Sequence, residues 1–165
     1  MAEHSAQTRL RARLAGELGS AVSEALIVRL AEVADRSDTG ATVLTLLDEL
    51  DSLSAKAARA AIEALPELDR RAGLSHLISW LDLGIALAES SGATALKYFK
   101  DSPLILGLIE RPDARTAVLA MGLELADQDA NVTLEYLHAA PHMLSVVPLD
   151  ELRPWLEIGL ELVEA

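Results

Sequence analysis

The sequence predicts an all-α protein, a right-handed α-solenoid-like stack of helical repeats of about 38 residues, similar to HEAT, armadillo and TPR arrays. Composition is the first reason: 51% of the 165 residues are hydrophobic but only 3% are aromatic. Ala and Leu dominate, and the β-branched and aromatic residues that favour strands are too sparse to build a sheet. The second reason is a regular recurrence of glycine, proline and aromatic residues.

Three glycines recur inside apolar runs at a nearly constant spacing. Gly84, Gly122 and Gly159 are separated by 38 and 37 residues. Other residues keep the same period, namely Pro66, Pro103 and Pro141, Tyr98 and Tyr136, and Trp80 and Trp155. Each tryptophan lies four residues before a glycine. Recurrence of several residue types at one offset predicts a tandem repeat.

We therefore expect one domain over 1–165. Its tandem units are predicted at 54–91, 92–128 and 129–165, after divergent N-terminal helices at 1–53. Leu46 stands where the glycine of an earlier unit would fall.

Hydrophobic periodicity, together with capping and helix-breaking residues, predicts the helices along the chain. They are expected over 5–18, 20–36, 41–53, 55–70, 75–90, 93–101, 104–110, 114–127, 130–139, 142–147 and 150–164. The expected N-cap residues, whose side-chain oxygens can accept from free backbone N–H groups, are Ser75, Asp113, Asp129 and Asp150. Pro103 and Pro141 are expected to end the preceding helices, because proline lacks an N–H and clashes with the turn before it.

The recurring glycines need a structural reason, because a mid-helix glycine costs about 1 kcal/mol relative to alanine. Close approach of another helix, or an aromatic ring over the bare backbone, would supply that reason. We expect Tyr98, Tyr136, Trp80 or Trp155 to pack near a glycine of the same or the next unit.

The formal net charge is −12, which argues against a general binder of nucleic-acid phosphates. Residues 1–112 carry a net charge of −4 and residues 113–165 a net charge of −8. The candidate partner-facing residues in this acidic region are Glu124, Asp127, Glu157 and Glu161. Their carboxylates either form a solvated face or attract a basic partner.

Motifs for catalysis or cofactor binding do not occur. The sequence has no cysteine, no phosphate-binding loop and no nucleophile elbow. The run from Asp127 to Asn131 begins like a calcium loop, but Val132 and His138 stand where that loop needs glycine and glutamate. We therefore read Asp129 as a helix cap and predict no catalytic, cofactor-binding or metal-binding residue.

The histidines have ordinary interpretations. His138 and His142 have the four-residue spacing of a helical metal site, but Pro141 between them is expected to turn the rings apart. His76 is expected to be the first exposed residue of its helix.

Two pairs of segments resemble a known kind of repeat. They are Ala95–Pro103 with Thr133–Pro141, and Trp80–Ala88 with Trp155–Leu162. They are similar to helical repeats upstream of the von Willebrand factor A domain in bacterial proteins of the nitric-oxide-reductase-activator type. The resemblance covers about residues 54–165. It implies a partnership with a MoxR-type AAA+ ATPase. The adhesion motif Asp-x-Ser-x-Ser is absent, so metal-dependent adhesion does not carry over.

The expected function is that of a non-enzymatic scaffold for protein–protein interaction. The partner would be an AAA+ ATPase, a further domain of the same chain, or a second copy packed through the C-terminal helix. The alternatives are a small-molecule binder or enzyme with a pocket lined by Tyr136, His138 or buried carboxylates, and an acidic mimic of nucleic acid. Without cysteines, a signal-like N-terminus or a run of about 18 apolar residues, we expect a cytoplasmic protein and no membrane span.

Overall fold

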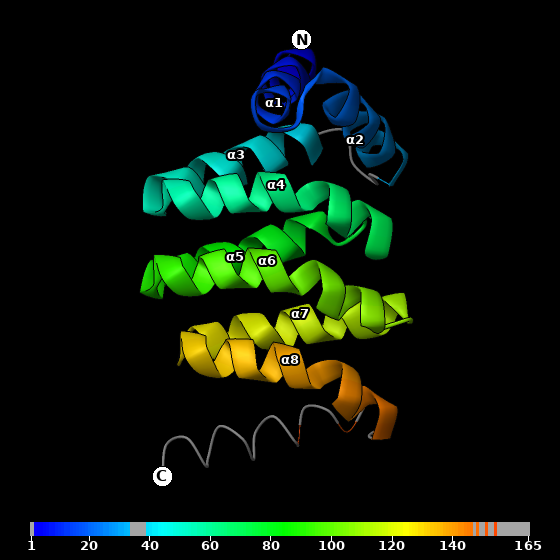
Figure 1. The fold of residues 1–165 in the computed structure, drawn as a ribbon, viewed down its shortest axis with the longest axis vertical. Coiled ribbons are helices and arrows are strands. Elements are labelled where there is room, and N and C mark those ends of the chain that lie inside the picture. Colours follow the sequence, from blue (N-terminus) through cyan, green and yellow to red (C-terminus); the bar gives the residue numbers. More distant parts are fainter. Residues whose placement is uncertain (1, 34–38, 147, 149–150, 152–153, 155–165) are drawn as a thin grey trace.

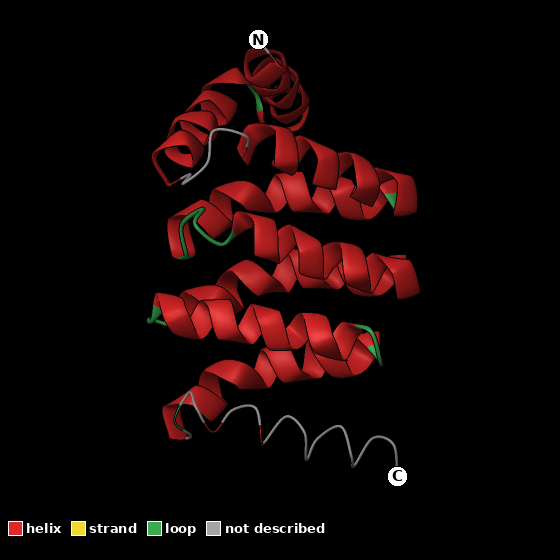
Figure 2. Ribbon diagram, turned by 180° about the vertical axis from the view of Figure 1, so that it is seen from behind, coloured by secondary structure: helices red, strands yellow, loops and turns green. Residues whose placement is uncertain are grey.

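The computed structural model describes residues 2–33, 39–146, 148, 151 and 154, which form eight α-helices and no β-strand. The helices are α1 (Ala2–Leu18), α2 (Ser20–Val33), α3 (Thr39–Leu53), α4 (Ala55–Arg71), α5 (Leu77–Ser90), α6 (Gly92–Leu108), α7 (Pro112–Ala126) and α8 (Ala130–Val146) (Figure 1). Short loops join the successive helices from α3 to α8 (Figure 2). None of the described helices is long and apolar enough to cross a bilayer.

From α3 to α8 the chain forms antiparallel helix pairs stacked on one another. The helices α3, α5 and α7 contact one another in order, and so do α4, α6 and α8. Two layers result, which we call the odd-helix layer (α3, α5, α7) and the even-helix layer (α4, α6, α8). The first two helices are oriented differently, since α1 is seen nearly end-on where α3 to α8 lie across the view (Figure 1).

The even helices continue through their prolines, so the predicted breaks at Pro103 and Pro141 are wrong. The three helices have 17 residues each, and Pro66, Pro103 or Pro141 is the twelfth residue of each. The predicted pairs 93–101 with 104–110 and 130–139 with 142–147 are therefore single helices. A proline inside a helix removes one hydrogen bond and bends the axis. Figure 1 shows α4 and α6 turning toward the next helix pair at their C-terminal ends.

Each even helix begins after a polar cap. Ser54 accepts from the Ala57 amide, and Ser91 accepts from the Thr94 amide. The predicted cap Asp129 is confirmed, because its carboxylate accepts from the Asn131 and Val132 amides.

The predicted caps of the odd helices are wrong. The cap of α5 is His76 instead of Ser75, and the cap of α7 is Arg111 instead of Asp113. Asp113 lies in the first turn of α7 and accepts from the Ala114 amide. Asp150 lies outside the described residues.

A fully buried aromatic cluster joins α5 and α6. The Trp80 and Phe99 rings meet edge to face with centroids 4.9 Å apart, and Tyr98 packs beside both. The Tyr98 hydroxyl donates to the Trp80 carbonyl oxygen at 2.7 Å, and Trp80 Nε1 donates to Ser102 Oγ at 2.7 Å. Every polar atom that these rings bury therefore has a partner in the same cluster.

The ring nearest to Gly84 is that of Phe99, a residue that was not among the four expected ones, and two of those four, Trp80 and Tyr98, pack against this ring. A Cβ at position 84 would lie 2.7 Å from Phe99 Cε1 and closer still to Cζ. Tyr98, one residue earlier, reaches the Trp80 carbonyl instead. At Gly122 the nearest side chains are those of Leu83 and Leu137.

Tyr136 is buried too, and its hydroxyl contacts the Met121 sulfur at 3.7 Å. Trp155 and Gly159 lie outside the described residues, as does the predicted helix over 150–164 apart from Glu151 and Pro154.

Candidate partner surface on the odd-helix layer

The two layers differ in charge. The odd helices carry seven acidic residues: Asp48, Glu49, Asp51, Asp82, Glu89, Asp113 and Glu124. Their one basic residue is Arg115. The even helices carry six basic residues, Lys56, Arg59, Arg70, Arg71, Lys97 and Lys100, against five acidic ones. Except for Arg115, the lysines and arginines of the paired helices thus lie in the even-helix layer, and the odd-helix layer is left acidic.

Carboxylates from successive odd helices lie near each other. Asp82 of α5 is partly buried, and its pKa is raised above the ordinary value, first by burial and then by repulsion from Glu49 of α3. Asp48 and Asp51, on the same helix as Glu49, pair instead with Arg13 of α1. A cation brought to the Glu49–Asp82 region would relieve this repulsion.

The predicted partner-facing residues fall in this layer as far as they are described. Glu124 is exposed in the last turn of α7, and Asp127 is exposed directly after that helix. Leu123, beside Glu124, is 40% exposed and adds an apolar contact point. Glu157 and Glu161 lie outside the described residues.

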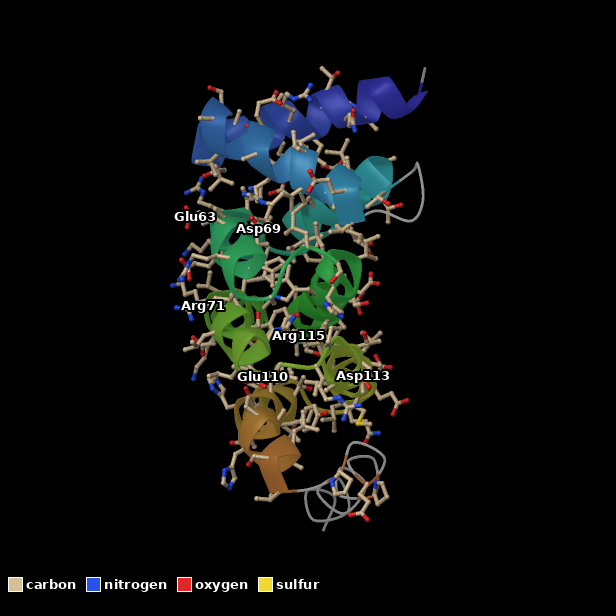
Figure 3. The ribbon with its side chains drawn as sticks, turned by 90° about the vertical axis from the view of Figure 1, so that its right-hand side faces the viewer. Glu63, Asp69, Arg71, Glu110, Asp113 and Arg115 are labelled. Carbon is tan, nitrogen blue, oxygen red and sulfur yellow. The ribbon has the colours of Figure 1, made fainter. Side chains whose placement is uncertain are left out.

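The guanidinium group of Arg115 is engaged by backbone carbonyl groups and does not add to the exposed charge of this layer. Its Nε donates to the carbonyl oxygens of Leu106 at 2.9 Å and Ile109 at 2.7 Å, and its Nη1 donates to Ala72 O at 3.1 Å. The guanidinium therefore joins the start of α7 to the C-terminal ends of α6 and α4 (Figure 3). Sequence reasoning missed this role, because only the fold brings the three carbonyls together.

His76 is buried, so its predicted exposure at a helix start is wrong. Its side chain reaches across to the first turn of α7, where Nε2 lies 3.2 Å from Pro112 O and 3.1 Å from Thr116 Oγ1. Burial is the largest effect and lowers the pKa of the imidazole. The hydrogen bond to the Pro112 carbonyl opposes this by raising the pKa, and the charge of Arg115 lowers it again, so that the pKa stays below its ordinary value.

His138 and His142 lie on the same unbroken helix, contrary to the expectation from Pro141. His138 Nε2 is 3.2 Å from Asp101 Oδ2 of α6. Among the described residues, no group of three or more His, Cys, Asp or Glu side chains is arranged to hold a metal ion.

A hollow of about 300 Å³ lies between the α6–α7 corner and the C-terminal part of α8. Its described walls are mostly apolar and include Leu108, Ile109, Pro141 and Leu144. Tyr136, His138 and the partly buried Asp82 are not among the described lining residues. The hollow therefore lacks the groups that the small-molecule hypothesis required, and that hypothesis stays a prediction.

No protein-family model, curated protein or solved structure matches this chain.

Proposed function

We propose that this chain is a non-enzymatic α-solenoid scaffold that binds a protein partner on its odd-helix layer. The stacked pairs from α3 to α8 support a repeat architecture. The even helices share their length, the position of their proline and a polar N-terminal cap. Stacked repeats present long continuous surfaces, which suit them to protein binding.

The observation that carries the proposal is the charge of the odd-helix layer. The helices of this layer carry seven carboxylates against one arginine, whose guanidinium is bonded to backbone carbonyls. Three of the seven pair with arginines outside these helices, Asp48 and Asp51 with Arg13 and Asp113 with Arg111, and the excess of negative charge is carried by the others. A surface of one charge sign favours a partner of the opposite sign and speeds its approach. The partner surface is therefore basic.

The sequence resemblance suggests a MoxR-type AAA+ ATPase as the partner, with assembly or regulation of that ATPase as the role. Under this proposal a basic surface of the ATPase faces α3, α5 and α7. The acidic mimic of nucleic acid remains a separate prediction, since Glu157 and Glu161, on which it also depends, lie outside the described residues.

The test is affinity capture from the native cell extract, followed by titration with the purified captured protein. A double variant, Glu49→Lys with Glu89→Lys, reverses charge on the exposed odd-helix layer. The matched control, Glu63→Lys with Glu135→Lys, makes the same change in net charge on exposed residues of the even-helix layer. Circular dichroism checks that both variants keep the helical fold.

We expect the wild-type chain and the control variant to capture the partner. The odd-layer variant should no longer capture it. We also expect binding to weaken as salt rises. Equal capture by both double variants would contradict the proposed surface. Turnover of a small molecule by the purified chain, with no protein captured, would contradict the scaffold function itself.

A further inference from the structure

His76 connects two successive helices of the odd-helix layer. It is 9% exposed and stands at the N-cap of α5. Its Nε2 lies 3.2 Å from the Pro112 carbonyl oxygen and 3.1 Å from Thr116 Oγ1, both in the first turn of α7. Its Nδ1 lies 3.2 Å from Ser75 Oγ. One imidazole thus spans from the start of α5 to the start of α7.

The neutral imidazole satisfies this environment completely. In the tautomer with the proton on Nε2, that N–H donates to Pro112 O, and Nδ1 accepts from the Ser75 hydroxyl. The Thr116 hydroxyl donates to the same Pro112 carbonyl at 3.1 Å. No proton beyond the one on Nε2 is needed to pair these atoms.

The surroundings oppose a second proton. The Arg115 guanidinium bonds to Ala72 O, four residues before His76, and it repels an imidazolium (Figure 3). The other charges near this corner are already paired: Arg111 with Asp113 on α7, and Arg70 and Arg71 with Glu67 on α4. The N-terminal end of α5 also disfavours positive charge. Glu110, in the α6–α7 loop, is exposed to solvent.

We propose that His76 is a pH-sensitive link between α5 and α7, and that mild acidification loosens the odd-helix layer at this junction. One repeat period later the residue is Ala114, which cannot titrate. The same link is therefore not repeated one period later.

The direction in which stability changes with pH follows from the difference between the folded and unfolded pKa values of His76. The pKa of His76 is lowered from 6.5 in the folded chain, first by burial. The stability that His76 contributes is therefore complete above pH 6.5 and is lost as pH falls toward its folded pKa. Within that window the equilibrium constant for opening the junction rises by up to about tenfold per pH unit.

Two measurements on the full chain test the link. Imidazole titration by NMR should give His76 a pKa below 6.5, and amide signals near Pro112–Thr116 should shift together with it. Hydrogen exchange, corrected for its intrinsic pH dependence, should speed up in the first turns of α5 and α7 between pH 7 and 5.5. The α3 and α4 amides serve as the internal reference.

The key variant is His76→Gln, because its amide can still donate to Pro112 O but does not titrate. It should abolish the acid-induced exchange at α5 and α7. The control His138→Gln changes an exposed histidine and should leave that response intact. A His76 pKa at or above 6.5 in the wild-type chain would overturn the proposal, and this measurement does not depend on whether the His76→Gln chain folds. An unchanged acid response in a folded His76→Gln chain would overturn it as well.

Discussion

The ring of Phe99 lies directly on the backbone of Gly84, in the space that a side chain at position 84 would fill. A Cβ there would stand 2.7 Å from Phe99 Cε1 and 2.8 Å from Cε2. Trp80 holds the ring from the other direction, edge to face. Gly84 therefore permits close packing of α5 against α6, which explains why a glycine is kept inside a buried helix.

Gly84→Ala should destabilise the protein, because the Phe99 ring has no room to retreat within its buried cluster. Overpacking costs roughly 1–3 kcal/mol. We expect this cost to exceed the helix-propensity gain of about 1 kcal/mol that alanine brings. Thermal and denaturant unfolding would measure the difference.

Two glycines provide controls for that variant. Gly16→Ala, with no atom within 4 Å of the new Cβ, should be neutral or stabilising. Gly122→Ala meets the tip of Leu83 at 3.0 Å and should be milder than Gly84→Ala, because that tip can move. Phe99→Leu should partly rescue Gly84→Ala. Equal stability of the Gly84→Ala and Gly16→Ala proteins would show that the ring does not need the bare backbone.

Arg115→Met should destabilise the chain by roughly 2–4 kcal/mol, because three backbone carbonyls lose a charged donor. Arg115→Lys should recover only part of this loss, since one ammonium group cannot reproduce the planar guanidinium. Denaturant titration measures both variants. Arg111→Lys is the control, because its ion pair with Asp113 is exposed to solvent and contributes little to stability. A loss no larger than that of the control would mean that Arg115 does not join α4, α6 and α7.

Asp82→Asn should stabilise the protein at pH 7. Burial, and then Glu49, raises the pKa of Asp82 in the folded chain. A carboxyl with a raised folded pKa contributes stability at pH values below its unfolded pKa of 3.8, and that contribution is lost as pH rises through the folded value. Unfolding free energies at pH 7 and pH 3.5 should therefore show an advantage for the amide only at the higher pH. Glu49→Gln should give a smaller gain of the same sign, and no gain in either variant would rule out the repulsion.

Much of the secondary structure was predictable from local chemistry. The helix ends at Leu18 and Leu53 and the starts at Ser20 and Ala55 agree with the predicted ranges. Polar caps such as Asp129 were readable because capping involves residues only two or three positions apart.

The prolines show where local reasoning fails. A proline inside a helix costs about 3 kcal/mol in isolation, so the sequence predicted breaks at Pro103 and Pro141. Both helices continue, because packing against neighbouring helices outweighs a local preference. Pro103 itself is buried between its neighbours.

Composition and periodicity were enough to establish an all-helical chain with an aliphatic core, because helix periodicity and capping act over a few residues. The placement of Phe99 on Gly84, the contact of His76 with Pro112 and the bond of Arg115 to the Ala72 carbonyl join residues 15 to 43 positions apart. The difference in charge between the acidic odd-helix layer and the nearly neutral even-helix layer arises in the same way, from the pairing of helices in space. These features depend on which helix faces which, and no local pattern in a chain encodes that choice.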